Sequence, residues 1–555
     1  MATKKTSLKS LNVKSKRQGE RPVSMASTEA RTVKPASTFA LMASSRAMAS
    51  APTARTAASK RGPPPLRYCA RELEAAVDND PKLAKKVSQL ERNITFSVTP
   101  KTLSGERLQA ARGLLHNTPL DPYRPRPDAR EAAVERLQQL GLKVLHVGRF
   151  AITAQGPAEL VADVVKAPLI IQTRPRPRDV RGLSSLAQQP LPSINDLFIS
   201  PENLSIPSKV SENIDDFVFT PPPLFFTAPS ATPPTLGYKH LDIANLRRLL
   251  KVPAQQETGK GISVAVVDTG FYKHPFYTAG GYAYRAVPAP GAASGSEWVD
   301  DEGHGTAIAM NVFAVAPGVE LAGVKYEGTP DAAFETALET GARIVSCSWG
   351  WDREQVFPIL EATIRDAIVT DGIIVLFASG NGHYAWPGSM PEVISIGGVY
   401  AAPDNNYALE ASNYASGYMS ALYSARCIPD VSGLCGQSPR AIYIPMPTQP
   451  GCLMDKQYGG KPFPDFDGTK GSDGWVVASG TSSATPQIAG VIALLLERAT
   501  NKGVKLTPER VRQLLQETAT PVSQGRNALG FPASGHPNVA CGFGLVNTEL
   551  ALSKI

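Results

Sequence analysis

Four polar residues of types that can carry out acyl-transfer chemistry stand where apolar segments of the chain end or begin. Asp268 ends the apolar run "GISVAVVD", His304 lies between two glycines, Asn381 follows "VLFASG", and Ser482 lies where a glycine-rich turn enters an apolar run. A serine hydroxyl is a poor nucleophile until a base takes its proton, and that base needs a partner that fixes its tautomer. The acid, the imidazole and the hydroxyl fit these roles, and the asparagine amide can donate to a developing oxyanion.

Each of these residues taken alone also has a purely structural explanation. An aspartate or asparagine after a strand is often a turn residue, and a histidine beside glycines often only packs. A serine at the start of a helix often caps it, and Ser483 suits that role as well as Ser482 does. The case for a catalytic set therefore depends on the combination within one region of the chain.

The segments around these residues alternate between short apolar runs and helical patterns from residue 236 to residue 555. Such alternation predicts an α/β fold with a mostly parallel sheet, in which functional groups gather at the carboxyl ends of the strands. The expected strands are 261–268, 319–326, 342–350, 372–381 and 392–399, and the expected helices are 304–315, 330–340, 353–370, 482–499 and 508–518.

The stretches "VAVVDTG", "GHGT", "SWG", "ASGNG" and "GTSSATPQIAG" resemble the subtilisin-like serine proteases, or subtilases, over residues 236–555. The chain order Asp–His–Ser also matches subtilisin. The resemblance implies a subtilisin-like three-layer α/β fold and a serine-type endopeptidase. In it Asp268 would orient the base, His304 would be the general base and Ser482 the nucleophile. Asn381 would form the oxyanion hole.

The resemblance further implies strands that bind an extended peptide and line the first specificity pocket. Trp349 is expected to narrow this cleft. The residues concerned are Ser348, Trp349, Gly350, Ala378, Ser379 and Gly380.

Three residues depart from the family pattern near the expected nucleophile and base. Ser483 replaces the usual Met, Gln487 replaces the usual His after the proline, and Ala307 replaces the second His of "HGTH". None belongs to the triad, so they do not argue against activity. The alternative is a pseudoprotease that acts as a binding or structural module, whose usual sign, a missing triad residue, is absent here. A lipase or esterase would carry a G-x-S-x-G elbow, which "GTSSA" does not match.

The N-terminal half contains a second predicted folded unit. Residues 66–173, with a core at 90–173, show the order β-α-β-β-α-β, which is typical of a small ferredoxin-like α+β domain, with "PLIIQT" (168–173) as the last strand. Many subtilases carry such a domain as a propeptide. The resemblance therefore implies a self-processing zymogen whose own propeptide is an intramolecular inhibitor. Residues 174–235 hold 12 prolines and are expected to be a linker that contains the processing site.

Three further segments carry expectations of their own. Residues 1–65 are expected to be a disordered basic leader, and residues 417–474 an insertion in the peptidase domain. Within the insertion, the oxygen ligands of "DFDGTKGSD" (465–473) could suit a structural Ca²⁺, although a polar surface loop fits equally well. No cofactor is expected to be required, and no catalytic metal.

Charge and hydropathy limit the partners and the location that can be inferred. Residues 1–61 hold seven Lys and six Arg against two acidic residues, a net charge of +11, so the rest of the +8 chain carries −3. The basic charge thus gives no argument that the folded part binds nucleic acid. No segment reaches the ~18 apolar residues of a membrane span, and no clear signal peptide is present. The default location is the cytoplasm, with secretion by a non-standard route as the alternative.

Overall fold

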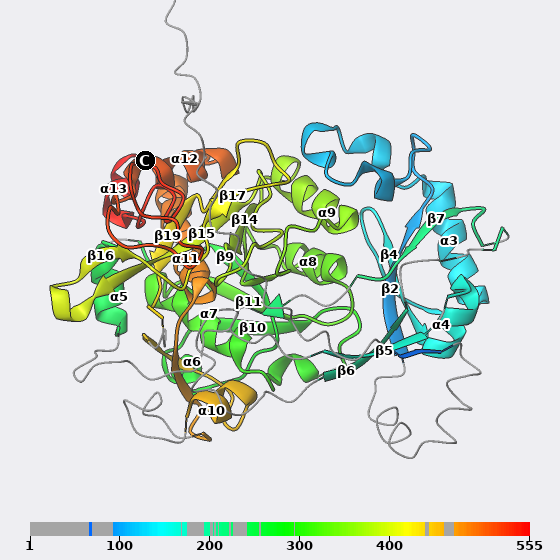
Figure 1. Cartoon of the computed structure of the whole chain (residues 1–555), viewed down its shortest axis with the longest axis horizontal. Coiled ribbons are helices and arrows are strands. Elements are labelled where there is room, and N and C mark those ends of the chain that lie inside the picture. Colours follow the sequence, from blue (N-terminus) through cyan, green and yellow to red (C-terminus); the bar gives the residue numbers. More distant parts are fainter. Residues whose placement is uncertain are drawn as a thin grey trace, which may run out of the picture. The chain divides into compact units, whose positions relative to one another are not determined.

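The computed structural model carries a central parallel sheet in the C-terminal part of the chain (Figure 1). The structure describes residues 66–68, 93–167, 169–174, 194–199, 204, 207–208, 210–220, 224–225, 241–254, 257–293, 295–438, 443–459 and 471–555. The expected leader lies outside these residues. In spatial order the sheet contains β10 (Ala283–Pro288), β11 (Glu320–Lys325), β9 (Ser263–Asp268), β12 (Ile344–Cys347), β14 (Ile374–Ala378), β15 (Ile394–Ala402) and β16 (Ala408–Ala411), with β19 (Val431–Leu434) also paired to β15. Only the pairing of β15 with β16 is antiparallel.

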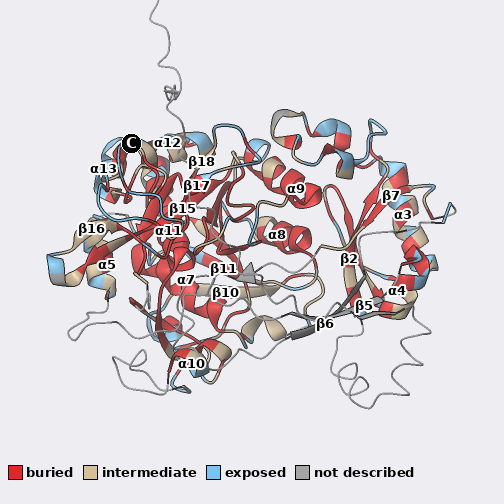
Figure 2. Cartoon of the chain, viewed as in Figure 1, coloured by how far each residue is buried: buried red, intermediate tan, exposed pale blue. Residues whose placement is uncertain are grey.

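Helices cover both faces of this sheet, as the alternation of strand and helix predicts. The side chains of β9 alternate between the faces: Val264 and Val266 belong to the core formed with α7 (His304–Val315) and α11 (Thr481–Asn501). Ala265 and Val267 belong to the core formed with α8 (Pro330–Glu339) and α9 (Pro358–Val369). Figure 2 shows buried residues throughout both layers. The mostly parallel three-layer arrangement is therefore confirmed.

Shorter elements complete this part of the chain. Two-stranded sheets pair β17 with β18 and β20 with β21. None of the helices among the described residues is long and apolar enough to cross a membrane. The elements are α5 (Ile243–Leu249), α6 (Pro275–Ala279), β17 (Tyr418–Met419), β18 (Cys427–Ile428), β20 (Ile444–Pro447), α10 (Leu453–Tyr458), β21 (Trp475–Ala478), α12 (Pro508–Thr518) and α13 (Thr548–Ser553).

The expected insertion at 417–474 is more than a surface loop. Its residues 431–434 form β19, a parallel strand of the central sheet. Met446 and Cys452 lie in the main hydrophobic core. The sequence alone does not predict β19, because "VSGL" is short and contains two small residues, so it lacks the apolar pattern of a buried strand. Its partner β15 also lies some thirty residues earlier in the chain.

The N-terminal elements form a separate antiparallel sheet with its own core. The sheet order is β3 (Lys143–Val147), β4 (Ile152–Pro157), β2 (Asn93–Pro100) and β7 (Ile214–Val218), and α3 (Pro127–Gln139) and α4 (Ala158–Val165) pack on it. Phe96, Leu137, Val161 and Phe217 are buried in this core. Short 3-10 turns at Leu108–Ala111, Leu115–Asn117 and Asp121–Tyr123 follow β2.

The predicted last strand of this unit is wrong. β5 (Leu169–Arg174) pairs with β1 (Leu66–Tyr68) and β6 (Ile194–Ile199), whereas β7 takes the fourth place beside β2. β6 and β7 both come from the stretch expected to be a linker. β7 escapes prediction because Asp216 interrupts its apolar pattern. Asp216 is buried and compensated by an ion pair with Arg107.

Candidate active site

The fold brings the expected catalytic residues to one edge of the central sheet. Asp268 is the last residue of β9, His304 is the first residue of α7, and Ser482 is the second residue of α11. Asn381 follows β14, which lies beside β12 and next but one to β9. These positions are the carboxyl ends of parallel strands and the starts of the helices that follow, where side chains from distant segments meet.

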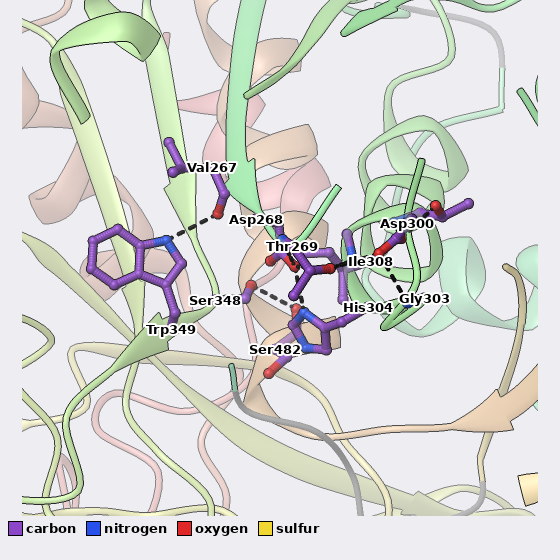
Figure 3. Close-up of polar contacts among 12 residues, drawn as sticks. Val267, Asp268, Thr269, Asp300, Gly303, His304, Ile308, Ser348, Trp349 and Ser482 are labelled. Carbon is purple, nitrogen blue, oxygen red and sulfur yellow. Dashed lines mark hydrogen bonds and ion pairs between the residues drawn. The ribbon is translucent and has the colours of Figure 1, made fainter. Parts of the chain in front are cut away.

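Asp268 and His304 form a buried hydrogen-bonded pair (Figure 3). Oδ1 of Asp268 lies 2.7 Å from Nδ1 of His304, and both residues are almost fully buried. The backbone N–H of Thr269 also donates to Asp268 Oδ1, at 2.8 Å. Because a carboxylate only accepts, Nδ1 carries the proton, and Nε2 of the neutral ring can accept one.

Ser482 lies in the first turn of α11, and in Figure 3 its side chain lies beside the imidazole of His304. The helix dipole and the free N–H groups of this turn favour negative charge on the serine oxygen. Pro486, the sixth helical residue, has no N–H for the carbonyl of Ser482, its i−4 partner. That carbonyl instead accepts a hydrogen bond of 3.0 Å from Ser348 Oγ, which anchors the serine to the strand region of the sheet.

The orientation of the Asn381 amide is set by Thr481, a residue that sequence reasoning missed. Asn381 Oδ1 lies 3.0 Å from the backbone N of Thr481 and 2.9 Å from its Oγ1. A backbone N–H can only donate, so the atom it contacts must be the amide oxygen. Within the described part of the chain, the buried Asn381 Nδ2 group has no hydrogen-bond partner, so it is available as a donor near Gly480 at the start of α11.

The expected substrate-binding segments are buried, and one side chain differs from its prediction. Ser348, Ala378 and Ser379 are almost fully inaccessible. Trp349 does not narrow a cleft, because its indole is buried in the core and Nε1 donates to the carbonyl of Val267 at 2.9 Å.

The backbone of the "SWG" segment nevertheless pairs with another strand. β13 (Trp349–Gly350) forms an antiparallel pair with β8 (Leu224–Phe225). The partners are Trp349 with Phe225 and Gly350 with Leu224. β8 comes from the stretch that was expected to hold the processing site.

The three departures from the family pattern are accommodated by local contacts. Ser483 Oγ lies 3.6 Å from the sulfur of Met446. Gln487 is buried, with its amide bonded to the backbone of Leu434 in β19 and to Asn311 in α7. Ala307 is buried in the core. Gln487 thus joins α11 to both β19 and α7.

A second missed residue, Asp300, lies just before the histidine helix. It is fully buried, and burial raises its pKa to about 6. Its carboxylate accepts hydrogen bonds from Thr269 and Thr306, on either side of the Asp268–His304 pair. A signal was present in the sequence, since "DDEGHG" places acids at the start of a helix, where they are favoured.

The described residues contain no group of three or more His, Cys, Asp or Glu side chains that could hold a metal ion. Most of the candidate calcium stretch, residues 465–470, lies outside the described part of the chain, so that expectation is untested.

Comparisons with known proteins agree with these observations. The model of the subtilase family matches residues 259–544, more than half of the chain. M-protease of Shouchella clausii (strain KSM-K16) is 27% identical over 317 residues, which cover 53% of this chain and 65% of that protein. Serine protease AprX of Bacillus subtilis (strain 168) is 28% identical over 305 residues, which cover 47% of this chain and 62% of AprX.

The matched region therefore spans less than two thirds of the length of these curated relatives. Among solved structures, fervidolysin from Fervidobacterium pennivorans, titled a keratinolytic enzyme related to subtilisin, aligns with a TM-score of 0.48 and 15% identity, covering 83% of this chain and 61% of that one. On the match of the family model to residues 259–544, the chain belongs to the subtilase family.

Proposed function

We propose that the chain is a serine endopeptidase that uses Asp268, His304 and Ser482 as its catalytic triad. The observation that carries the proposal is the buried 2.7 Å contact between Asp268 and His304, with Ser482 beside the same imidazole (Figure 3). The pair leaves Nε2 as the acceptor that a serine hydroxyl requires.

In the proposed reaction, Ser482 Oγ attacks the carbonyl carbon of a peptide bond while His304 Nε2 takes the hydroxyl proton. Asp268 stabilises the imidazolium that forms. The tetrahedral oxyanion receives hydrogen bonds from Asn381 Nδ2 and the backbone N–H of Ser482. His304 then gives its proton to the departing amine, which leaves an acyl-enzyme. In the second half, His304 takes a proton from the water that attacks this ester and returns a proton to Ser482 Oγ as the acid product leaves.

The substrate of this site is an extended polypeptide. The backbone of β13 already accepts an antiparallel strand, and strand addition reads the substrate main chain rather than one side chain. We infer that β8 occupies part of the position of a substrate, which would put the processing bond shortly after Phe225. The first 225 residues or so would then be removed from the mature enzyme.

We further propose that the N-terminal sheet unit acts as the inhibitory propeptide before release. This proposal is supported by its polar contacts with α8 and α9. Ser97 Oγ donates to the buried Asp331 carboxylate at 3.1 Å, and His146 Nε2 lies 2.7 Å from Glu335. Arg149 binds Asp366 at 2.8 Å.

The test compares wild type with Ser482→Ala on a gel and in a peptide hydrolysis assay. Wild type is expected to hydrolyse peptides and to shorten to a fragment whose N-terminus follows β8. Ser482→Ala is expected to stay full-length and inactive. A wild type that neither shortens nor hydrolyses, even after the N-terminal fragment is removed by another protease, would refute the proposal and favour the binding-module alternative.

A further inference from the structure

The carboxylate of Asp300 is saturated by donors from both sides of the catalytic pair. Oδ1 accepts from Thr269 Oγ1 at 2.8 Å and from the N–H of Gly303 at 2.9 Å. Oδ2 accepts from the N–H of Thr306 at 2.8 Å and from its Oγ1 at 2.6 Å. Figure 3 shows Asp300 beside the first turn of α7. A buried carboxylate with four donors has little freedom to move.

These donors belong to the two segments that present the catalytic acid and base. Thr269 directly follows Asp268, and its hydroxyl also accepts from the N–H of Gly305 at 3.0 Å. Gly303 and Thr306 flank His304 in the chain. Asp300 therefore links the end of β9 to the start of α7 through hydrogen bonds within one or two residues of each partner in the 2.7 Å contact.

Residues 448–454, within the segment expected to be an insertion, bind the loop of residues 300–303. Gln449 Oε1 accepts from the N–H of Asp300 at 2.8 Å, and Thr448 Oγ1 donates to the carbonyl of Gly303 at 3.0 Å. Two N–H groups at the start of α10 also donate to this loop. The N–H of Leu453 donates to the carbonyl of Asp301 at 2.8 Å, and the N–H of Met454 donates to the carbonyl of Glu302 at 3.0 Å. The loop before His304 is thus fixed along its whole length.

The charge of Asp300 also suits its place. It lies at the N-terminus of a 12-residue helix, where the dipole favours an anion, and near the imidazolium that forms during the reaction. The other titratable groups that interact with it are Tyr277, Tyr284 and Cys452, and burial raises the pKa of each, so they stay neutral.

We propose that Asp300 is a positioning residue that sets the geometry of the Asp268–His304 pair, and that Thr448 and Gln449 hold it in place. The proposal rests on the proposed function for its kinetic consequence only. A misplacement of a catalytic group by about 1 Å costs on the order of 100-fold in rate.

The experiment uses Asp300→Asn, with Asp301→Asn as the matched control at the exposed neighbour. Asp300→Asn turns one end of the carboxylate into a donor, which opposes either Thr306 or Thr269 and Gly303. We expect kcat to fall by about 100-fold with KM within twofold, while Asp301→Asn changes neither. Gln449→Ala, which removes the acceptor for the N–H of Asp300, is expected to lose about fivefold in kcat.

A second readout does not depend on activity. The low-field proton resonance of the Asp268–His304 hydrogen bond is measured in each variant, whose folding is checked by circular dichroism. We expect the resonance to shift or disappear in Asp300→Asn and to persist in Asp301→Asn, even if the wild type proves inactive. Folded Asp300→Asn with an unchanged resonance would overturn the positioning role. If Asp300→Asn does not fold, Gln449→Ala decides by the same criterion.

Discussion

Asp366 offers the sharpest test of how the N-terminal unit is held on the peptidase domain. Its Oδ1 lies 2.8 Å from Arg124 and its Oδ2 2.8 Å from Arg149, and its side chain is only 2% exposed. Burial by itself would raise the pKa of Asp366. Hydrogen bonds from Thr370, Arg149 and Arg124 nevertheless hold it below its usual value. The carboxylate therefore stays ionised and binds both guanidinium groups.

The magnitude follows from these two contacts. A hydrogen bond to a charged group contributes about 1.5–3 kcal/mol. Both arginines stay about one third exposed, and each keeps a second acidic partner, Asp121 or Asp371, so solvent and these partners recover part of the loss. Asp366→Asn should then weaken the association by about 2 kcal/mol, which is about 30-fold in the dissociation constant.

The assay is the recovery of peptidase activity when processed enzyme is diluted, since dilution releases a non-covalent inhibitor. Asp366→Asn should reach half of its full specific activity at an enzyme concentration about 30-fold higher than wild type does. Asp352→Asn, which removes an exposed carboxylate elsewhere, serves as control. Equal midpoints for Asp366→Asn and wild type, with the N-terminal fragment intact in both, would refute the reasoning.

Two further predictions concern the oxyanion donor and a buried acid. Thr481→Val removes the hydroxyl that orients Asn381, so kcat should fall about fivefold with KM unchanged. Thr481→Ser keeps the hydroxyl, so its kcat should stay near that of wild type. A change in KM alone would contradict this prediction. Burial raises the pKa of Glu361 to about 7, above its value of about 4.3 in an unfolded chain. Between these two pH values the folded protein keeps a proton that the unfolded chain loses. The protonated Glu361 therefore lowers the free energy of unfolding as pH rises toward 7. In a Ser482→Ala background, Glu361→Gln should therefore match its parent in melting temperature near pH 4 and exceed it increasingly up to about pH 8; a constant difference would contradict the assignment.

Local patterns in the sequence predicted the elements that carry the proposed catalytic residues. The helix expected at 304–315 has these bounds in the structure, and so does the one at 508–518, where Thr507 caps the helix and Pro508 begins it. The apolar strand ending in Asp268 was found because its burial on both faces leaves an unbroken apolar run.

Features that depend on distant partners could not be predicted in this way. β7 was missed because the burial of Asp216 makes sense only once Arg107 is placed beside it. Trp349 was expected to line the cleft because its neighbours Ser348 and Gly350 were expected to bind substrate. The side chain points inward because strand alternation and the carbonyl of Val267 favour the core. The role of Asp300 required the positions of Thr269 and Gln449, which are 31 and 149 residues away along the chain.

The most direct measurement of the central claim is the site of covalent modification by a fluorophosphonate. Such a reagent reacts with a serine only when a base has activated it. Wild-type protein freed of its N-terminal fragment is labelled, digested and mapped by mass spectrometry. The account predicts one adduct, on Ser482, which is absent from His304→Ala although Ser482 is still present. An adduct on Ser483, or equal labelling of the His304→Ala variant, would contradict it.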